Sequence, residues 1–402
     1  MVRELKHTEI GDIPVDWELQ TFDETFRVIS NNTLSRENLN NRGGAVRNIH
    51  YGDILTKFPE VLDCNEEEIP YVNELSLLSS STQLLQDGDI VVADTAEDET
   101  VGKVIEVQNL GDSKLVAGLH TIPCRVKKGE FAPGWLGYYM NSDLFHNQIL
   151  PYITGIKVSS ISKGAISETL ILVPPFDEQE KIVQSLNKIQ LLMTTETKVV
   201  NKIKLVKNGC LSKMFPQKDD TVPEMRLPGF NEAWEQRKLG DEVSSIDTGK
   251  SKFDAKESGD YEILGSTGVI GYDDSFDYEG DFLLTARVGA NAGTLYRHSG
   301  KLKITDNTVF LQGSHIDFAF YLLDKFDLKK MSFGSGQPLI KASELKCLEL
   351  MMPVQNEEKE KIATYFLNLD NLITLHQCKC DKYSNIKKGM MSDLLTGKIR
   401  LV

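Results

Sequence analysis

One stretch of this chain occurs twice and decides the fold. It reads DEQEKIVQSLNKIQ at residues 177–190 and EEKEKIATYFLNLD at residues 357–370, and the likeness continues to Phe215 and Leu395. The offset between the two copies stays at 180 residues throughout. A repeat that is found only twice, in a chain of this length, indicates a duplicated module rather than a solenoid.

Each copy predicts a long helix. Seam residues recur at alternating steps of four and three, which is the spacing of a coiled coil. Because such a stripe is unstable when it faces water, the two helices are expected to pack on each other. The predicted seam comprises Ile182, Leu186, Ile189, Met193 and Glu196 in the first helix, and Ile362, Phe366, Leu369, Ile373 and His376 in the second. Polar residues interrupt both seams at equivalent places, Glu196 with His376 and Lys207 with Lys387.

The regions in front of the two helices are unlike each other. Short apolar runs at residues 89–93, 170–173 and 282–286 are bounded by Gly, Asp or Pro, which is typical of strands. Residues 133–149 and 317–330 have helical spacing instead. Each front is therefore predicted to be a globular domain of the mixed α/β (α+β) class, and the whole chain to be a pseudo-twofold duplication.

These patterns divide the chain into seven segments. They are an N-terminal segment at 1–17, a first globular domain at 18–173, a long helix at 174–216, a linker at 217–234, a second globular domain at 235–352, a second long helix at 353–396 and a C-terminal tail at 397–402.

The composition is that of an ordinary globular protein. Of the 402 residues, 40% are hydrophobic and 26% are charged, and no apolar run is long enough to span a membrane. The first residues lack the apolar stretch of a signal peptide, and six Cys without such a signal favour reduced thiols and a cytoplasmic location. The net charge of −14 argues against a protein that binds nucleic acid over its whole surface.

No set of residues typical of catalysis is found. The nearest approach to a phosphate-binding loop has Ser244 where the first Gly is required. Cys378 and Cys380 lie on different sides of a predicted helix, and no further ligand follows at zinc spacing. Four histidines are isolated in the sequence and are interpreted as structural or solvent-exposed: His50, His120, His298 and His315. We therefore expect neither a catalytic residue nor a metal in this chain.

Basic side chains are nevertheless clustered in both globular domains. Arg and Lys neutralise phosphates, and Arg, Asn and Gln read base edges through hydrogen bonds. Ordinary solvated surface charge is the alternative interpretation for any single residue. The candidate DNA-binding residues are Arg36, Arg42, Arg47, Lys57, Lys157 and Lys163 in the first domain, and Lys250, Lys252, Arg287, Asn291, Arg297, Lys301, Lys303 and Gln337 in the second.

The arrangement as a whole resembles a known family. The first helix begins with the motif Pro-x-x-x-Glu-Gln-x-Lys-Ile at residues 174–182, whereas the second copy has one extra residue after Pro353 and has Lys359 in place of Gln. Trp-Glu pairs at 17–18 and 234–235 stand at the start of the two globular domains, and GDFLLTAR at 280–287 resembles a recurring target-recognition pattern. Over nearly its whole length, the chain resembles the specificity subunit of type I restriction–modification enzymes.

This resemblance implies a non-catalytic subunit of a bacterial defence system. Each globular domain would be a target-recognition domain that reads one half of a bipartite, gapped sequence in double-stranded DNA. The two long helices would lie antiparallel, hold the domains apart and dock two methyltransferase (modification) subunits. S-adenosylmethionine would bind to those subunits, and ATP to the restriction subunits that translocate DNA. No cofactor is expected in this chain.

Antiparallel helices related by a pseudo-twofold axis bring their centres together. The polar seam residues Glu196 and His376 are therefore predicted to meet and to fix the register. One rival interpretation is a coiled-coil scaffold with two unrelated binding domains and no role on DNA. Another is a self-contained restriction enzyme.

Overall fold

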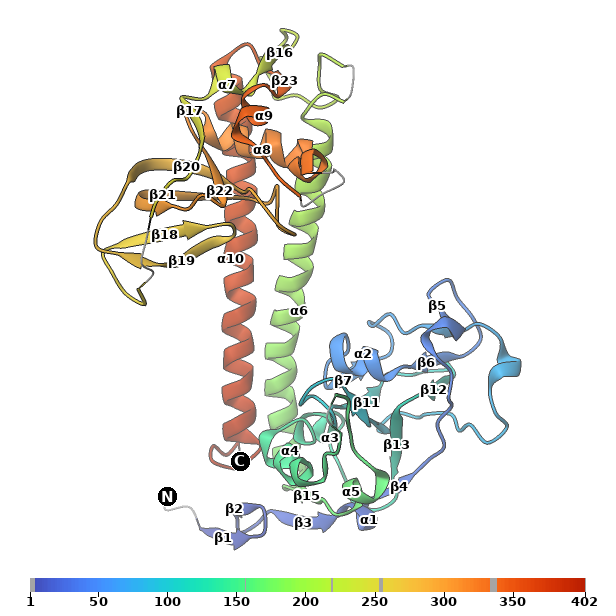
Figure 1. Ribbon diagram of the computed structural model, residues 1–402. Helices are drawn as coiled ribbons and strands as arrows, with labels where there is room; N and C mark the ends of the chain where they lie inside the picture. The colour runs from blue at the N-terminus through green and yellow to red at the C-terminus, as the bar shows by residue number, and fades with distance from the viewer. Residues whose placement is uncertain (1–3, 156, 218–219, 253–255, 333–337, 402) are drawn as a thin grey trace. The chain divides into compact units, whose positions relative to one another are not determined.

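The chain folds into two compact units. The computed structural model describes residues 4–155, 157–217, 220–252, 256–332 and 338–401. Unit 1 comprises Met1–Thr195 and Cys380–Val402, and unit 2 comprises Glu196–Lys379. Each unit therefore combines one globular domain with a part of both long helices (Figure 1), which are α6 (Phe176–Lys213) and α10 (Asn356–Leu394).

Contacts inside unit 2 show that α6 and α10 run antiparallel. In unit 2, Lys207 Nζ lies 2.6 Å from Asp370 Oδ1, and Cys210 Sγ lies 3.2 Å from the Tyr365 hydroxyl. Residue numbers thus rise along α6 while they fall along α10. Each residue of the predicted seam is buried or half-buried.

The polar seam residues meet as the pseudo-twofold predicts. The His376 imidazole Nδ1 donates a hydrogen bond to the Glu196 carboxylate, which also lies 3.5 Å from Lys379 Nζ. The hydrogen bond from His376, with Lys379 nearby, holds the pKa of Glu196 below its usual range. The predicted contact between the two helix centres is therefore confirmed.

Unit 1 is built on two main sheets. The larger has the strand order β4-β13-β9-β11-β7, in which only the β7–β11 pair is parallel, and the smaller has the order β12-β6-β8-β5. Its aromatic core includes Trp17, Trp135 and Tyr139. The strands are β1 (Leu5–Thr8), β2 (Gly11–Pro14), β3 (Glu18–Thr21), β4 (Phe26–Val28), β5 (Leu39–Asn40), β6 (Arg47–Ile49), β7 (Val61–Asp63), β8 (Tyr71–Val72), β9 (Ile90–Ala93), β10 (Thr95–Ala96), β11 (Val104–Gln108), β12 (Leu115–Ala117), β13 (Thr121–Val126), β14 (Ser159–Ser160) and β15 (Leu170–Val173). The shorter helices are α1 (Phe22–Thr25), α2 (Tyr51–Thr56), α3 (Trp135–Tyr139), α4 (Asp143–Ile149) and α5 (Lys163–Ser167), with 3-10 turns at Arg36–Asn38, Leu75–Leu77 and Leu150–Tyr152.

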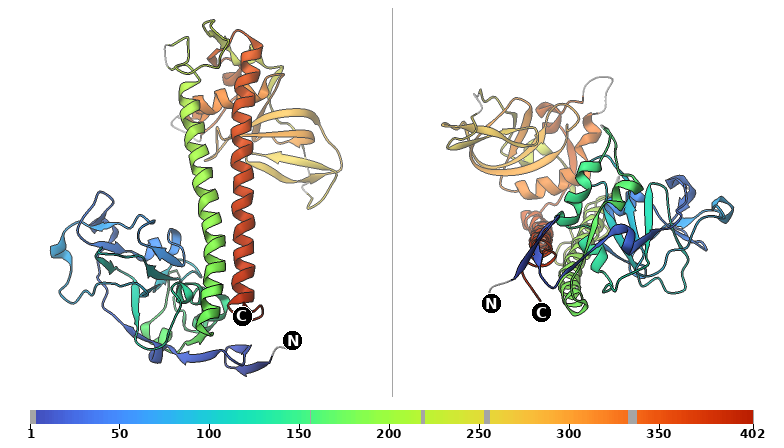
Figure 2. Two further views of the ribbon diagram at one scale, coloured as in Figure 1. Left: turned by 180° about the vertical axis from the view of Figure 1, so that it is seen from behind. Right: turned by 90° about the horizontal axis from the view of Figure 1, so that it is seen from below.

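Unit 2 is built on a single main sheet. Its strand order is β17-β22-β20-β21-β18-β19, with β18 parallel to β21. Figure 2 shows this sheet beside the α10 segment of the same unit. Helix α8 buries Phe318 against Trp234 and Tyr321 against Phe366. The elements are β16 (Glu235–Lys238), α7 (Leu239–Glu242), β17 (Ser245–Thr248), β18 (Tyr261–Gly265), β19 (Gly268–Asp273), β20 (Tyr278–Ala286), β21 (Leu295–Ile304), β22 (Thr308–Gln312), α8 (Ile316–Phe326), a 3-10 turn at Leu328–Ser332, α9 (Ala342–Lys346) and β23 (Glu349–Met352).

A buried glutamate near the start of each long helix joins distant segments in both units. In unit 1 the Glu178 carboxylate accepts hydrogen bonds from the Trp17 indole at 2.9 Å and from the Arg400 guanidinium at 2.6 and 2.7 Å. In unit 2 Glu358 accepts equivalent bonds from Trp234 at 3.4 Å and from Arg226 at 2.7 and 2.8 Å. We call this Trp–Glu–Arg arrangement the clamp. The C-terminal tail supplies its arginine in unit 1, and the linker supplies it in unit 2.

Candidate nucleic-acid interface

Loops from three distant parts of the sequence meet in unit 1. Strand β6 ends at Ile49, so that His50 and Tyr51 form the start of α2. Strand β9 ends at Ala93, and β10 follows it as the next strand. Strand β10 pairs antiparallel with β14, which comes shortly after Lys157 in the chain. Lys157 lies in the cationic loop 154–158 and is exposed. Lys157 therefore lies three residues before Ser160, whose partner in this pairing is Thr95.

The start of α2 carries an ion pair and a neutral histidine. The Arg36 guanidinium lies 2.8 Å from Asp53 Oδ2 and is half exposed. His50 is buried, and its Nδ1 accepts a hydrogen bond from the Gly52 N–H at 3.1 Å. Burial, together with the nearby positive charge of Arg36, lowers the pKa of His50. His50 therefore acts as a neutral cap of α2, and Arg36 is the charged group that faces solvent here.

One predicted residue of unit 1 lies inside the domain. Arg47 is only 8% exposed, and its guanidinium donates a hydrogen bond to the Cys64 carbonyl at 2.6 Å. Its expected place at the surface is therefore wrong, because β6 lies between two other strands of the smaller sheet. The other predicted residues of this unit are exposed: Arg36, Arg42, Lys57, Lys157 and Lys163.

Four loops of unit 2 meet at one end of its sheet. The Arg287 N–H donates to the Asn307 carbonyl at 2.9 Å, and the Gly249 N–H donates to the Thr308 carbonyl at 2.9 Å. The Ser266 hydroxyl, in the turn between β18 and β19, donates to the Asn307 carbonyl at 3.2 Å. The loop with Lys250 and Lys252, the β18–β19 turn, the loop after β20 and the loop before β22 are thus neighbours.

The predicted residues of unit 2 fall into three groups. Lys250, Lys252, Asn291 and Lys301 are exposed, and Arg287 is half-buried. Lys303 is 7% exposed and lies 3.0 Å from Asp273 Oδ2, so that its expected surface position is wrong. Arg297 is turned towards the helices, where it lies 2.8 Å from Asp317 and 4.3 Å from the centre of the Phe320 ring. Gln337 lies outside the described residues.

Sequence reasoning missed several neighbours of these basic residues. His120 was interpreted as isolated, yet the structure places its ring 5.2 Å from that of Tyr51. The Ser266 and Asn307 positions in unit 2 were not singled out as partners of the Arg287 loop. The one available signal for Asn307 is the stretch TDNT at residues 305–308, which resembles a recurring target-recognition pattern. No spacing in the sequence indicates that residues 51 and 120 meet.

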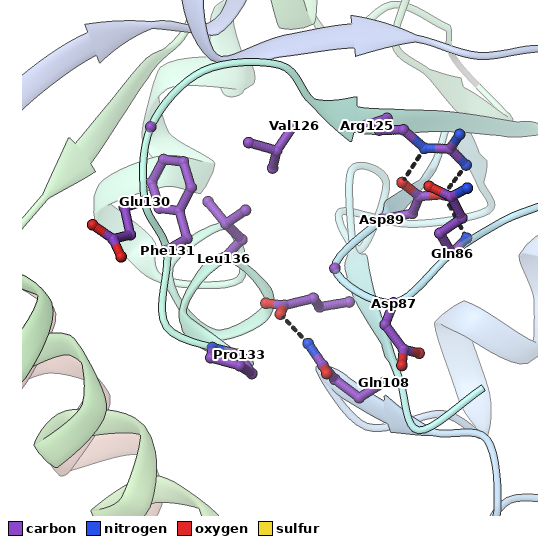
Figure 3. A pocket seen from close by; sticks show the side chains of 13 residues that line it. Gln86, Asp87, Asp89, Gln108, Arg125, Val126, Glu130, Phe131, Pro133 and Leu136 are labelled. Carbon is purple, nitrogen blue, oxygen red and sulfur yellow. Dashed lines mark hydrogen bonds and ion pairs between the residues drawn. The ribbon is translucent and has the colours of Figure 1, made fainter. Parts of the chain in front are cut away.

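A cavity lies at the end of the larger sheet of unit 1 that is opposite to His50 and Lys157, and its lining is acidic rather than basic. It has a volume of about 510 Å³ and is lined by residues 86–89, which precede β9, and by the ends of β11 and β13. Figure 3 shows the Arg125–Asp89 ion pair at one side of it and Glu130 with Phe131 at the other. Asp87 and the buried Glu106 add two further carboxyl groups. An excess of carboxyl groups repels phosphates, so this end of the sheet does not suit DNA.

Two classes of site are absent from the part of the chain that the structure describes. Within it, no three or more His, Cys, Asp and Glu side chains are grouped so that they could hold a metal ion. No helix formed by these residues has the length and the apolar character that crossing a membrane requires.

Most of the chain matches known proteins. Residues 14–205 and 231–382 match the profile of the type I restriction modification DNA specificity domain. A protein of Methanocaldococcus jannaschii described as the type I restriction enzyme MjaX specificity subunit is 25% identical, over 98% of this chain and 96% of its own length. The MjaVIII specificity subunit of the same organism is 27% identical over 61% of this chain and 66% of its own.

Solved structures share the fold. The S subunit of a type I restriction-modification system from M. genitalium superposes with a TM-score of 0.66, at 14% identity, over 98% of this chain and 99% of that one. A chain from a solved type I R-M system superposes with a TM-score of 0.52, at 15% identity, over 96% of this chain and 99% of that one. The domain profile covers most of the chain in two copies, and the chain therefore belongs to the family of type I restriction–modification DNA specificity subunits. It is a specificity subunit rather than a catalytic one.

Proposed function

We propose that this chain gives a type I restriction–modification complex its target by reading a bipartite, gapped DNA sequence with its two globular domains. The observation that supports this proposal is the repeated frame. The clamp and the antiparallel helix segments recur in both units, whereas the sheets they carry differ in strand number and order. Two similar modules with different reading surfaces suit the two unlike half-sites of an asymmetric target on a duplex.

Only a part of the binding energy comes from this chain. Its net charge is −14, and not all of the predicted DNA-binding residues in the two globular domains are exposed. Phosphate contacts provide most non-specific affinity, whereas contacts to base edges provide sequence discrimination. We therefore assign base reading to the loops described above and much of the phosphate contact to the partner subunits.

Apolar side chains left exposed on the long helices support docking of two methyltransferase subunits. In unit 1, Leu192 of α6 and Ile386 of α10 are 45% and 39% exposed, and in unit 2, Val206 of α6 and Leu372 of α10 are 45% and 42% exposed. Leu192 and Leu372, like Val206 and Ile386, are equivalent positions in the repeat. Leu192 and Val206 are also two heptads apart, so that they lie on one side of α6. Exposed apolar groups of this kind mark contact surfaces for other proteins.

The reactions belong to the partners in this proposal. S-adenosylmethionine binds to the methyltransferase subunits, and ATP binds to the restriction subunits that move along DNA. This chain provides the sequence specificity and the surface on which the other subunits assemble. It works in the cytoplasm, where the DNA is.

The direct test is to map methylated sites with the complex assembled from co-expressed subunits. Wild-type complex is expected to methylate one gapped motif. Replacing residues 18–173 with the corresponding domain of a relative should change one half of that motif and leave the other half unchanged. A complex that methylates without sequence preference, or a swap that changes both halves, would contradict the proposal.

A second test addresses docking. Leu192→Glu and Leu372→Glu each place a charge on one of the two equivalent surfaces, and each is expected to reduce the bound methyltransferase from two copies to one. Leu5→Glu makes the same change at a leucine that is 52% exposed but lies in strand β1 rather than on a long helix, and serves as the control. Native mass spectrometry counts the copies. Two copies bound to both helix variants would exclude docking at these positions.

A further inference from the structure

His120 is held by a small hydrogen-bonding network with Asp94 and Thr95, the two residues that follow β9 in unit 1. Its Nδ1 lies 3.2 Å from the Thr95 hydroxyl oxygen and 3.4 Å from Asp94 Oδ1. The Thr95 hydroxyl in turn donates a hydrogen bond to Asp94 Oδ1 at 2.8 Å. The His120 side chain remains 46% exposed. It is therefore both anchored and open to a ligand.

This network determines which nitrogen of the ring carries a proton. A threonine hydroxyl has one hydrogen, and here Asp94 receives it. Both oxygen atoms near His120 Nδ1 are consequently acceptors, so that Nδ1 must be the donor. In the neutral imidazole the other nitrogen, Nε2, then presents a lone pair. Within the described residues, Nε2 has no hydrogen-bond partner among the contacts of His120.

The backbone at His120 is unusual as well. Its φ is +56°, in the left-handed region that residues other than glycine rarely adopt. The carbonyl of His120 accepts a hydrogen bond from the Asp94 N–H at 3.1 Å, which holds this conformation. Strained positions of this kind are found preferentially at functional sites, where the surrounding structure fixes them.

The groups around His120 are suited to a base edge beside a phosphate backbone. The Tyr51 ring meets the imidazole edge-on with 5.2 Å between ring centroids, and the Tyr51 ring also lies 4.7 Å from that of His50. Asp94 is tied to the segment after the cationic loop, because its carbonyl accepts from the Ile161 N–H at 2.9 Å. The exposed Lys157 in that loop can neutralise a phosphate.

We propose that His120 is a specificity-determining residue of the first recognition domain, and that its Nε2 accepts a hydrogen bond from the exocyclic amino group of an adenine or a cytosine. In the major groove, only these two bases present such a donor. Asp94 and Thr95 are positioning residues, because they fix the proton on Nδ1 and the orientation of the ring. This inference rests on the proposed function, since it presumes that the domain reads DNA.

The test uses the complex assembled with its methyltransferase subunits. His120→Gly removes the imidazole and accepts the left-handed backbone, so that the fold is maintained. Affinity for the mapped target is expected to fall by about tenfold to a hundredfold, the effect of losing one good base contact, while affinity for random duplex stays unchanged. The methylated motif should become degenerate at one position of the half read by the first domain. His7→Gly is the matched control, because His7 also pairs with an aspartate, Asp12, at 2.8 Å but lies in the β1–β2 hairpin.

Modified target DNA supplies a measurement that needs no variant. Adenines of the first half-site are replaced one at a time by deoxynebularine, and cytosines by an analogue without the amino group. Wild-type complex should lose affinity at the one position that His120 reads, and His120→Gly should no longer distinguish the two DNAs there. Asp94→Asn should reduce the ratio of specific to non-specific affinity without abolishing binding to random duplex.

The outcomes separate this inference from the function on which it rests. If wild-type complex methylates one bipartite motif while His120→Gly leaves both the motif and the affinity ratio unchanged, His120 is not a specificity determinant and the proposed function stands. If the wild-type complex shows no sequence preference, the proposed function itself fails.

Discussion

Unit 1 and unit 2 hold a buried glutamate with the same partners and then build different sheets beside it. Glu178 and Glu358 are 2% and 1% exposed, and each binds one tryptophan and one arginine. Unit 1 carries a five-stranded and a four-stranded sheet, whereas unit 2 carries a single six-stranded sheet. The groups that stabilise a unit are thus separate from the loops that we propose to read a target. Such a separation lets the reading surface differ between the units while the frame stays the same.

The lysines that interrupt the helix seam also have equivalent surroundings in the two units. Lys387 in unit 1 lies 5.3 Å from the centre of the Tyr138 ring and donates to Gln190 at 2.8 Å. Lys207 in unit 2 lies 5.4 Å from the centre of the Tyr321 ring and donates to Asp370, the residue equivalent to Gln190, at 2.6 Å. A lysine in a seam costs desolvation, and in both units an aromatic face and polar partners offset it.

Substitutions in the clamp should have the largest effect on stability, and they test whether the two units are equivalent. Glu178→Ala leaves Arg400 and the Trp17 indole without their acceptor, and Glu358→Ala does the same to Arg226 and Trp234. Removing one member of a buried ion pair costs about 3–5 kcal/mol, so both variants should lose that much free energy of unfolding. Urea denaturation followed by tryptophan fluorescence measures the loss.

Glu180→Ala, at an exposed position of the same helix, is the control for this pair of variants. Glu178 also accepts a hydrogen bond from the Leu401 N–H at 3.2 Å, so its loss should cost at least as much as that of Glu358. A clear loss in one unit together with none in the other would show that the two clamps are not equivalent.

The lysines of the seam give a smaller effect and a predicted asymmetry. Lys387→Met leaves Glu60, which lies 2.5 Å from Lys387 Nζ, without its cation. Lys207→Met removes one partner of Asp370. Asp370 keeps a hydrogen bond from the Tyr321 hydroxyl at 2.6 Å, and Arg297 lies 3.5 Å away. An unsatisfied buried partner costs about 1–3 kcal/mol, and Lys387→Met should therefore be the more destabilising change.

Lys388→Met, at an exposed neighbour in α10, controls for the loss of a lysine itself. Thermal and urea unfolding should rank the three variants in the order Lys387→Met, Lys207→Met, Lys388→Met. The reverse order for the first two would mean that Asp370 depends on Lys207 more than its other contacts indicate.

At the Glu196–His376 contact the two equivalent residues of the repeat differ in charge, and changing this contact should give the smallest effect. The hydrogen bond from His376 lowers the pKa of Glu196 from its ordinary value of 4.5. Ionised Glu196 therefore adds stability above the pKa it has in the unfolded chain, and this contribution is lost as the pH falls through its lower pKa in the folded chain. Glu196→Gln should be less stable than wild type at neutral pH and equally stable in acid.

A second variant makes the two copies of the repeat identical at this position. His376→Glu sets two carboxylates against each other, and it should destabilise more than Glu196→Gln above the ionisation range and recover as the pH falls. Unfolding midpoints measured between neutral pH and about pH 3 test both variants. A difference between Glu196→Gln and wild type that grows in acid would contradict the assigned direction of the pKa shift.

The architecture could be predicted because its signals are local. The four–three spacing and the offset of 180 residues indicated both long helices, and α6 and α10 begin at Phe176 and Asn356, within three residues of the predicted boundaries. The strand predicted at 170–173 is β15 as observed. Symmetry alone then predicted the contact of Glu196 with His376.

The site could be predicted only in part. Lysines such as Lys157 and Lys252 are exposed because they lie in loops, which the sequence indicates through its polar character. Arg47 and Lys303 have the same chemistry but lie in strands, where their neighbours bury them. The second long helix has Lys359 where the first has Gln179, and only the structure shows why: Lys359 pairs with Glu242 of unit 2.

The sequence by itself determined that the chain is a duplicated module with two long helices, since periodicity and repetition are properties of neighbouring residues. It also determined the family, through motifs that recur in order. The tertiary structure decided which basic groups face solvent and which distant groups meet. Whether Arg47 is buried depends on Cys64, and whether His120 is isolated depends on Tyr51 and Asp94. Such contacts join residues whose separation along the chain no local pattern records, because burial and hydrogen bonding are fixed only when the sheets assemble.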